Sequence, residues 1–166
     1  MLKNRRPDIG FIPTEPEMIQ AAFALANITP SDVIYDLGCG DGRVAISAAL
    51  QFGTQAVGID IDPQRIKEAQ ENALQAKVSN LVEFRLDDLF TCNFSEATVV
   101  FLYLLPHLNL KLKPQLLQQL KPNSRIVSRD FDMGDWLPEK SIMIATAEEE
   151  CRLYLWHIPG NLSTGH

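Results

Sequence analysis

The segment from Val33 to Arg43 constrains the fold and the chemistry of this chain more than any other. An apolar strand, Val-Ile-Tyr-Asp-Leu, carries an acid near its end and is followed by three alternating glycines before a helix begins. Gly38 and Gly40 allow the backbone to turn sharply and to approach a ligand without Cβ contacts. The N–H groups that open the next helix face the same space. This pattern predicts a loop that binds a nucleotide cofactor.

The third glycine of the loop decides which cofactor fits. A dinucleotide fingerprint needs a glycine three residues after the second one, but Arg43 stands there, and the third glycine is Gly42. Asp36 and Asp41 would repel a pyrophosphate. They would accept an amino-acid tail, because its ammonium could pair with a carboxylate while its own carboxylate takes loop N–H groups. A glycine-rich turn kept for packing alone is the alternative.

A second strand, from Gln55 to Asp60, ends in an acid twenty residues after Gly40. A carboxylate at this spacing can accept both hydroxyls of a ribose, although the spacing alone does not separate NAD from S-adenosylmethionine. Ile61 would supply an apolar face for an adenine ring. Asp62 is better explained as the cap of the helix that Pro63 begins.

The string Asp36-Leu-Gly-Cys-Gly-Asp-Gly resembles motif I of the class I S-adenosylmethionine-dependent methyltransferases. The resemblance implies S-adenosylmethionine as the cofactor and S-adenosylhomocysteine as the product. It also implies a Rossmann-like α/β fold: a mostly parallel seven-stranded sheet with a C-terminal antiparallel hairpin and helices on both faces. By the same resemblance, Asp88 accepts the adenine amino group and the backbone N–H of Leu89 reaches a ring nitrogen. Asp87 and Asp88 could equally form a solvated turn.

Four further strings resemble one branch of these enzymes, the bacterial proteins related to the mitochondrial lysine methyltransferases of adenine nucleotide translocase and of the c-type ring protein of ATP synthase. They are Phe11-Ile-Pro-Thr-Glu-Pro-Glu, Ala97-Thr-Val-Val-Phe-Leu-Tyr-Leu-Leu-Pro, Leu112-Lys-Pro-Gln-Leu-Leu and Arg125-Ile-Val-Ser. The branch implies a lysine amine as methyl acceptor. Thr14 and Glu15 could close over the cofactor, although Glu15 could instead stabilise the first turn of a helix.

The segment after the fourth strand bears on the acceptor. Phe101-Leu-Tyr-Leu-Leu-Pro lacks the Asn/Asp-Pro-Pro-aromatic motif of enzymes that methylate amide or exocyclic base nitrogens. This argues against adenine N6, cytosine N4 and glutamine amide, and an amine fits best. Tyr103 is a candidate for the methyl channel, but an aromatic residue in an apolar strand is more often core.

Two carboxylates are candidate catalytic residues. Asp130 and Asp132 follow the fifth strand and could hydrogen-bond an incoming ammonium, while Phe131 or Trp136 could form a wall of its path. Ordinary turn chemistry around Gly134 is an equal alternative. A base is not essential, because desolvation lowers the pKa of an amine and positioning supplies much of the remaining catalysis.

Charge and composition limit the partners. The chain has 15 basic and 21 acidic residues, a net charge of -6, which disfavours nucleic acid and suits a basic protein substrate. A small-molecule O- or N-methyltransferase and a non-catalytic S-adenosylmethionine-binding module remain alternatives, and an NAD-dependent oxidoreductase is the weakest. Three scattered cysteines and three histidines show no metal-ligand spacing, so no metal is expected.

The 166 residues are expected to form a single domain, with a core over residues 9–158 and a loose tail over 161–166. The N-terminus lacks an apolar segment after its charges, so no secretory signal, no membrane-embedded substrate and a cytoplasmic location are expected. Alternating periodicity predicts helices at 15–26, 43–52, 63–77 and 110–120, and strands at 32–37, 55–60, 81–86, 98–104, 125–131, 141–146 and 152–157. Pro114 is expected in the first turn of its helix or at a kink.

Overall fold

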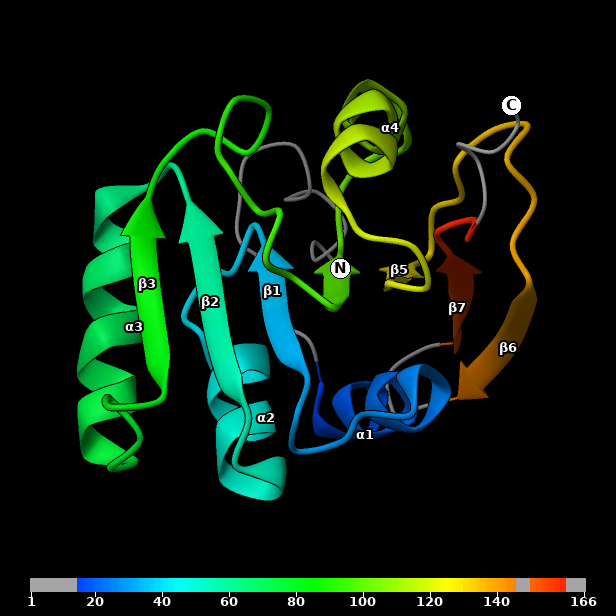
Figure 1. The fold of residues 1–166 in the computed structure, drawn as a ribbon. Helices are drawn as coiled ribbons and strands as arrows, with labels where there is room; N and C mark the ends of the chain where they lie inside the picture. The colour runs from blue at the N-terminus through cyan, green and yellow to red at the C-terminus, as the bar shows by residue number, and fades with distance from the viewer. Residues whose placement is uncertain (1–14, 146–149, 161–166) are drawn as a thin grey trace, which may run out of the picture.

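The computed structural model describes residues 15–145 and 150–160, and its centre is a seven-stranded sheet in the order β3-β2-β1-β4-β5-β7-β6 (Figure 1). Strands β1 to β5 are parallel, and β7 pairs antiparallel with both β5 and β6. This confirms the predicted fold class. The elements are α1 Pro16–Ala26, β1 Val33–Leu37, α2 Arg43–Phe52, β2 Gln55–Asp60, α3 Pro63–Gln75, β3 Val82–Leu86, β4 Val99–Leu102, α4 Pro106–Gln119, β5 Arg125–Arg129, β6 Lys140–Ala145 and β7 Glu150–His157.

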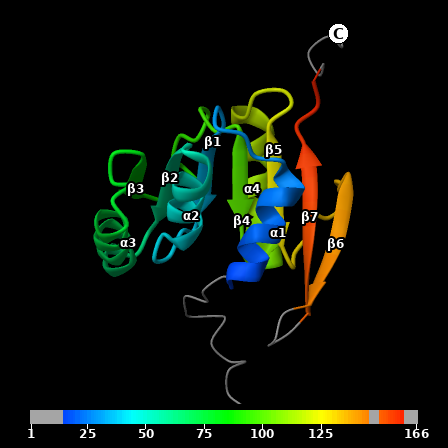
Figure 2. The same cartoon turned by 90° about the horizontal axis from the view of Figure 1, so that it is seen from below.

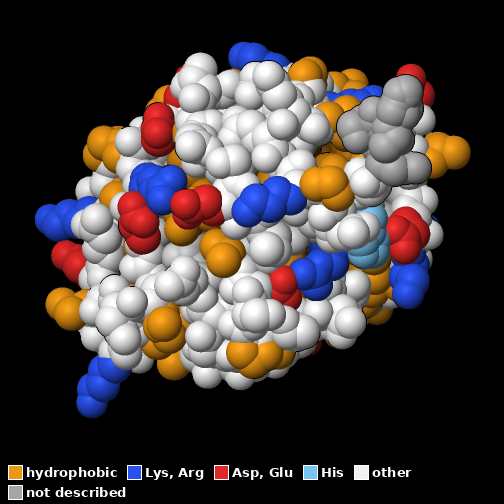
Figure 3. All heavy atoms as spheres, in the orientation of Figure 1, with side chains coloured by type: hydrophobic (Ala, Val, Ile, Leu, Met, Phe, Trp, Pro, Cys, Tyr) orange, Lys and Arg blue, Asp and Glu red, His pale blue; other side chains and the backbone are white. Residues whose placement is uncertain are grey.

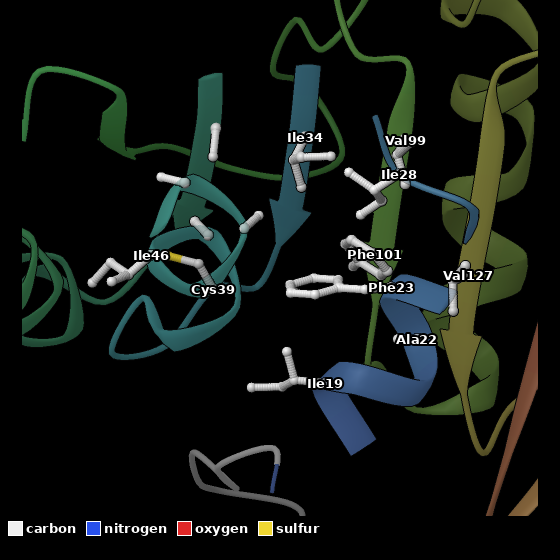
Figure 4. Close-up of a cluster of buried hydrophobic side chains, with 14 of the residues drawn as sticks. Ile19, Ala22, Phe23, Ile28, Ile34, Cys39, Ile46, Val99, Phe101 and Val127 are labelled. Atoms are coloured by element: carbon white, nitrogen blue, oxygen red, sulfur yellow. The ribbon is translucent and has the colours of Figure 1, made fainter. Parts of the chain in front are cut away.

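Helices cover both faces of the sheet (Figures 1 and 2). Alternate residues of β4 point to opposite faces: Val99 and Phe101 pack with α1, α2 and α3, while Val100 and Leu102 pack with α4. Figure 4 shows the first of these clusters, where Phe23 of α1 lies beside Phe101. A parallel strand buried on both faces needs an unbroken apolar sequence, and β4 has one.

Several element ends differ from the predicted ones. Helix α4 begins at Pro106, not at residue 110, because proline at the first helical position loses no hydrogen bond and has a suitable φ. Pro114 therefore lies inside the helix, and its expected place in the first turn is wrong. Strand β5 ends at Arg129, not at residue 131, since Asp130 has a φ of 70° and leaves the extended conformation. Strand β4 ends at Leu102, and α3 ends at Gln75.

Among the residues that the structure describes, no helix combines the length and the apolar character needed to cross a membrane. The predicted tail at 161–166 and the residues before Glu15 lie outside the described ranges.

Candidate active site

The main cavity has a volume of about 460 Å³ and lies where the strand order reverses, between β1 and β4. Ligands of open α/β sheets bind at this switch point, at the carboxyl ends of the strands. The glycine loop and the end of β2 form one side of the cavity, and helix α1 with the ends of β4 and β5 forms the other. The lining carboxylates among the described residues are Asp36, Asp41, Asp60 and Asp62.

The glycine loop is held against β2 by its backbone. The N–H groups of Gly38 and Cys39 both donate to the carbonyl oxygen of Ile59, at 2.8 and 3.0 Å. Gly42 caps α2 with a φ of 85°, and a Cβ there would lie 2.6 Å from the Phe84 ring. The third glycine is thus required for packing between the loop and β3, while Gly38 and Gly40 line the cavity.

Asp36 is a buried carboxylate in the cavity wall, with 7% of its surface exposed. Burial, and then the negative charges of Asp60 and Asp41, raise its pKa to about 8. A cation bound beside this group would stabilise its ionised form. The ammonium of an amino-acid tail is such a cation, so the site fits the zwitterionic end of S-adenosylmethionine.

Asp60 links two loops at the end of β2. Its Oδ2 accepts from the N–H of Gly40 at 2.9 Å, and its Oδ1 accepts from the N–H of Asp62 at 3.0 Å. Each carboxylate oxygen has a second lone pair, so both can still accept a hydroxyl. This geometry is compatible with the predicted ribose contact. The side chain of Asp62 accepts from the N–H of Gln64 and caps α3, as expected.

Asp41 is paired within the loop. Arg43 forms a two-pronged contact with it, Nη2 to Oδ2 at 2.7 Å and Nε to Oδ1 at 3.1 Å. The Asn72 side chain also donates to the carbonyl oxygen of Asp41 at 3.0 Å. Asp41 therefore lines the cavity with its charge already countered, and its role toward a cofactor stays a prediction.

The predicted adenine-binding residues lie beside the cavity and are not among its lining residues. Ile61 is 69% exposed. The Oδ1 of Asp88 accepts from the N–H of Phe90 at 2.9 Å, which is a turn contact. The N–H of Asp87 donates to the carbonyl oxygen of Asp60, so the end of β3 lies next to the ribose candidate. The roles of Ile61, Asp88 and Leu89 stay predictions, and Thr14 lies outside the described residues.

The candidate catalytic carboxylates are not brought into the cavity wall. The Oδ1 of Asp130 accepts from the N–H of Arg152 at 3.1 Å, and the Oδ1 of Asp132 accepts from the N–H of Gly134 at 3.1 Å. Their neighbours Arg129 and Phe131 line the cavity instead. The structure therefore gives both carboxylates structural contacts, and a catalytic role for either stays a prediction.

The acceptor end of the cavity, as we name the part at the ends of β4 and β5, is aromatic. The Tyr103 and Phe131 rings are nearly parallel, with centroids 6.5 Å apart and an interplanar angle of 14°. The guanidinium of Arg129, a side chain that is almost fully buried, lies 4.4 Å from the centroid of the Tyr103 ring. The interpretation of Tyr103 as a cavity residue is thus favoured over a purely core role.

Sequence reasoning missed several lining residues. Met18, Ile19 and Phe23 of α1 reach the cavity, although periodicity indicated only a buried helix face. Arg129 was missed as well, and a lone cation at the end of an apolar strand was the available signal. Among residues 15–145 and 150–160, no group of three or more His, Cys, Asp or Glu side chains could hold a metal ion.

Comparisons with known proteins agree with this site. A family model described as the ANTKMT methyltransferase domain matches residues 36–140. The chain is 36% identical over 153 residues to a protein-lysine N-methyltransferase of Saccharolobus islandicus, covering 92% of this chain and 95% of that protein. It is 26% identical over 135 residues to the human lysine N-methyltransferase named for the c-type ring protein of ATP synthase, and this match spans 81% of the chain but only 57% of the human protein.

A solved structure resembles the chain over nearly its whole length. It is the crystal structure of an RNA methyltransferase from Salinibacter ruber in complex with S-adenosyl-L-homocysteine, with 47% identity, a TM-score of 0.85, and coverage of 91% of this chain and 96% of that one. A methyltransferase that uses S-adenosylmethionine is the class that accounts for both the acidic glycine loop and these matches. Within that class, the chain belongs to the ANTKMT methyltransferase domain family.

Proposed function

We propose that this enzyme methylates the side-chain amine of lysine in a protein. The observation that carries the proposal is the acceptor end of the cavity, where aliphatic and aromatic side chains from α1, β4 and β5 surround the route to the methyl donor. Such a wall suits an aliphatic chain that ends in a neutral amine. The Saccharolobus and human relatives, which are named as lysine methyltransferases, support the same acceptor.

Bound S-adenosylmethionine would supply an electrophilic methyl group on a sulfonium, which the amine nitrogen attacks in line as the carbon–sulfur bond breaks. Asp36 would hold the ammonium of the amino-acid tail, and the N–H groups of Gly38 and Gly40 are candidates for its carboxylate. Asp60 would hold the ribose hydroxyls. Ile61, Asp88 and Leu89 would lie on the adenine side.

The acceptor amine must lose a proton before it attacks, because a free lysine has a pKa of about 10.4. The apolar and aromatic lining would favour the neutral amine by excluding water. No lining carboxylate among the described residues comes from the acceptor end. Desolvation and alignment are therefore proposed as the main contributions of the protein to the chemical step.

RNA is the second candidate acceptor, since the Salinibacter ruber structure is described as an RNA methyltransferase. Charge argues against it: the chain has a net charge of -6, and acidic and basic side chains are interspersed on the face in Figure 3. A polyanion is bound chiefly through a continuous basic surface. A protein substrate is therefore the preferred proposal, and a small-molecule acceptor and a cytoplasmic location stay predictions.

The test is to label a cell lysate with methyl-labelled S-adenosylmethionine and the purified enzyme, and to divide the products by protease and ribonuclease treatment. Protease-sensitive label that yields methylated lysine on acid hydrolysis is the expected result. Ribonuclease-sensitive label would overturn the lysine proposal in favour of RNA, and label only in small molecules would overturn both. Asp36→Ala should abolish transfer, while the matched control Asp135→Ala changes an exposed carboxylate outside the cavity lining.

A further inference from the structure

A buried polar cluster lies behind the acceptor end of the cavity. Asn109 of α4 and Ser128 of β5 are both 0% exposed. The Asn109 Nδ2 lies 3.1 Å from Ser128 Oγ, 3.0 Å from the carbonyl oxygen of Phe131 and 3.3 Å from that of Asp132. The Ser128 hydroxyl also donates to the carbonyl oxygen of Phe131, at 2.6 Å. One amide and one hydroxyl thus hold the backbone on both sides of the peptide that follows Phe131.

This cluster fixes a backbone that the local sequence does not favour. Asp130 has a φ of 70°, a conformation that costs energy for a residue with a Cβ. On the β7 side, its N–H donates to the carbonyl oxygen of Arg152 at 2.7 Å, and its carboxylate accepts from the Arg152 N–H. The segment 130–132 is therefore held by β7 on one side and by α4 on the other.

The side chain that this arrangement places is Phe131. It lines the cavity, nearly parallel to the Tyr103 ring, and Tyr103 lies in turn against the Arg129 guanidinium. Two aromatic rings from neighbouring strands thus form one continuous wall. Without the bonds from Asn109 and Ser128, nothing in segment 130–132 itself would keep Phe131 at this angle.

The cost of the cluster indicates that it has a purpose beyond folding. The Asn109 Oδ1 is buried and has no hydrogen-bond partner among the described residues. An unpaired buried acceptor costs roughly 1–3 kcal/mol, and an apolar residue facing the core from α4 would avoid that cost. The chain therefore accepts a penalty at Asn109 and in return fixes the loop that carries Phe131.

We propose that Asn109 is a positioning residue for the methyl acceptor. It holds Phe131 against Tyr103, so that the two rings form the wall on which the aliphatic chain of the acceptor lysine packs. The proposal rests on lysine as the acceptor. It assigns no role to Asn109 in cofactor binding, because Asn109 is not among the cavity-lining residues.

The test compares Asn109→Ala, Phe131→Ala and the double variant, with Asn93→Ala as a matched control at an exposed asparagine. Methyl transfer is measured against increasing amounts of cell lysate, and S-adenosylhomocysteine binding is measured by calorimetry. Each single change should raise the half-saturating lysate concentration about fivefold or more, and the double variant should be no worse than Phe131→Ala alone. The dissociation constant for S-adenosylhomocysteine should stay within about twofold of wild type.

Additive effects in the double variant, or a loss of thermal stability with unchanged half-saturation, would show that Asn109 is merely structural. Ser128→Ala removes only a hydroxyl and serves if Asn109→Ala fails to fold; it should weaken acceptor binding in the same way. A crystal structure of the variant should show the Phe131 ring moved away from Tyr103. If the label proves to be in RNA while these effects hold, the lysine acceptor is wrong but the positioning role is not.

Discussion

At the scale of single residues, the buried carboxylate of Asp36 has the strongest consequence. Its pKa is raised to about 8 by burial and by the neighbouring charges of Asp60 and Asp41. In the unfolded chain the same group ionises near its ordinary pKa of about 3.9. Between these two values the folded state binds the extra proton, so this residue makes the free energy of unfolding fall as the pH rises.

The first prediction follows from that sign. Asp36→Asn should stabilise the cofactor-free protein, because it removes the cost of keeping or ionising a buried acid, and the gain should grow between about pH 4 and pH 8. At pH 8 we expect roughly 2 kcal/mol or more in the free energy of unfolding, measured by urea denaturation. Asp135→Asn is the matched control. An equal gain at pH 5 and pH 8 would contradict the raised pKa.

The second prediction concerns binding at the same residue. If Asp36 pairs with the ammonium of the cofactor tail, binding below pH 8 must release a proton from the carboxyl group. The affinity for S-adenosylhomocysteine should therefore increase from pH 6 to pH 8, by at most about tenfold per pH unit. Calorimetry in two buffers of different ionisation enthalpy should detect up to one released proton near pH 7. Asp36→Asn should bind more weakly and lose this pH dependence.

At the scale of elements, Gly42 joins the glycine loop and α2 to β3. A Cβ there would meet the Phe84 ring at 2.6 Å and the Ala69 methyl at 3.0 Å, at a φ of 85°. Gly53, at the other end of α2, has a φ of 70° but no atom within 4 Å of a built Cβ. The two glycines therefore separate the cost of backbone conformation from the cost of a steric clash.

We predict that Gly42→Ala lowers the free energy of unfolding by about 2–5 kcal/mol, from the left-handed backbone and the overpacking together. Gly53→Ala should cost only about 1–2 kcal/mol. Denaturant titration of both variants gives the difference. Equal losses would mean that Phe84 moves aside without cost.

A buried ion pair ties the amino ends of the elements together. Asp32 precedes β1, and Arg125 of β5 pairs with its Oδ1 while also donating to the carbonyl oxygen of Ala26 at 2.6 Å. Burial alone would raise the pKa of Asp32, but hydrogen bonds from Thr29 and Thr98, with the charge of Arg125, hold it below its ordinary value. The carboxylate thus stabilises the fold at neutral pH, and this contribution is lost as the pH falls through that lowered pKa.

We expect Asp32→Ala to destabilise the protein by about 3–5 kcal/mol, because it leaves a buried guanidinium without its carboxylate. Asp135→Ala breaks an exposed ion pair with Lys113 and should cost about 1 kcal/mol or less. Thermal denaturation at pH 7 measures both. At a temperature where Asp32→Ala is folded it should still bind S-adenosylhomocysteine, and a large loss of binding would contradict a purely structural role.

At the scale of the whole molecule, strand order creates the site. The chain extends the sheet from β1 to β2 and β3, and then crosses to place β4 and β5 on the other side of β1. Asp36 and Asp60 consequently lie on one side of the cavity, and Tyr103 and Phe131 on the other. The acidic side matches a cationic donor and the aromatic side matches an aliphatic acceptor, so the reversal brings two chemistries into one cavity.

The sequence predicted the residues whose position depends on local pattern. Asp36 and Asp60 were located because each ends an apolar strand and because Gly38 and Gly40 indicate a turn toward a ligand. It did not predict Arg129 or Asn109 as site residues, and it placed the start of α4 too late. Their environments depend on contacts between β4, β5 and α4, and no pattern within one segment encodes those contacts.

The sequence by itself determined the class of fold, the cofactor loop and the acids at the ends of β1 and β2, because strand periodicity and glycine conformation are local properties. Only the tertiary structure decided which side chains form the acceptor end, since helix α1 and segment 130–132 meet there from opposite ends of the chain. It also decided that Asp130 and Asp132 use their carboxylates in backbone contacts, because the nearest N–H groups are those of Arg152 and Gly134.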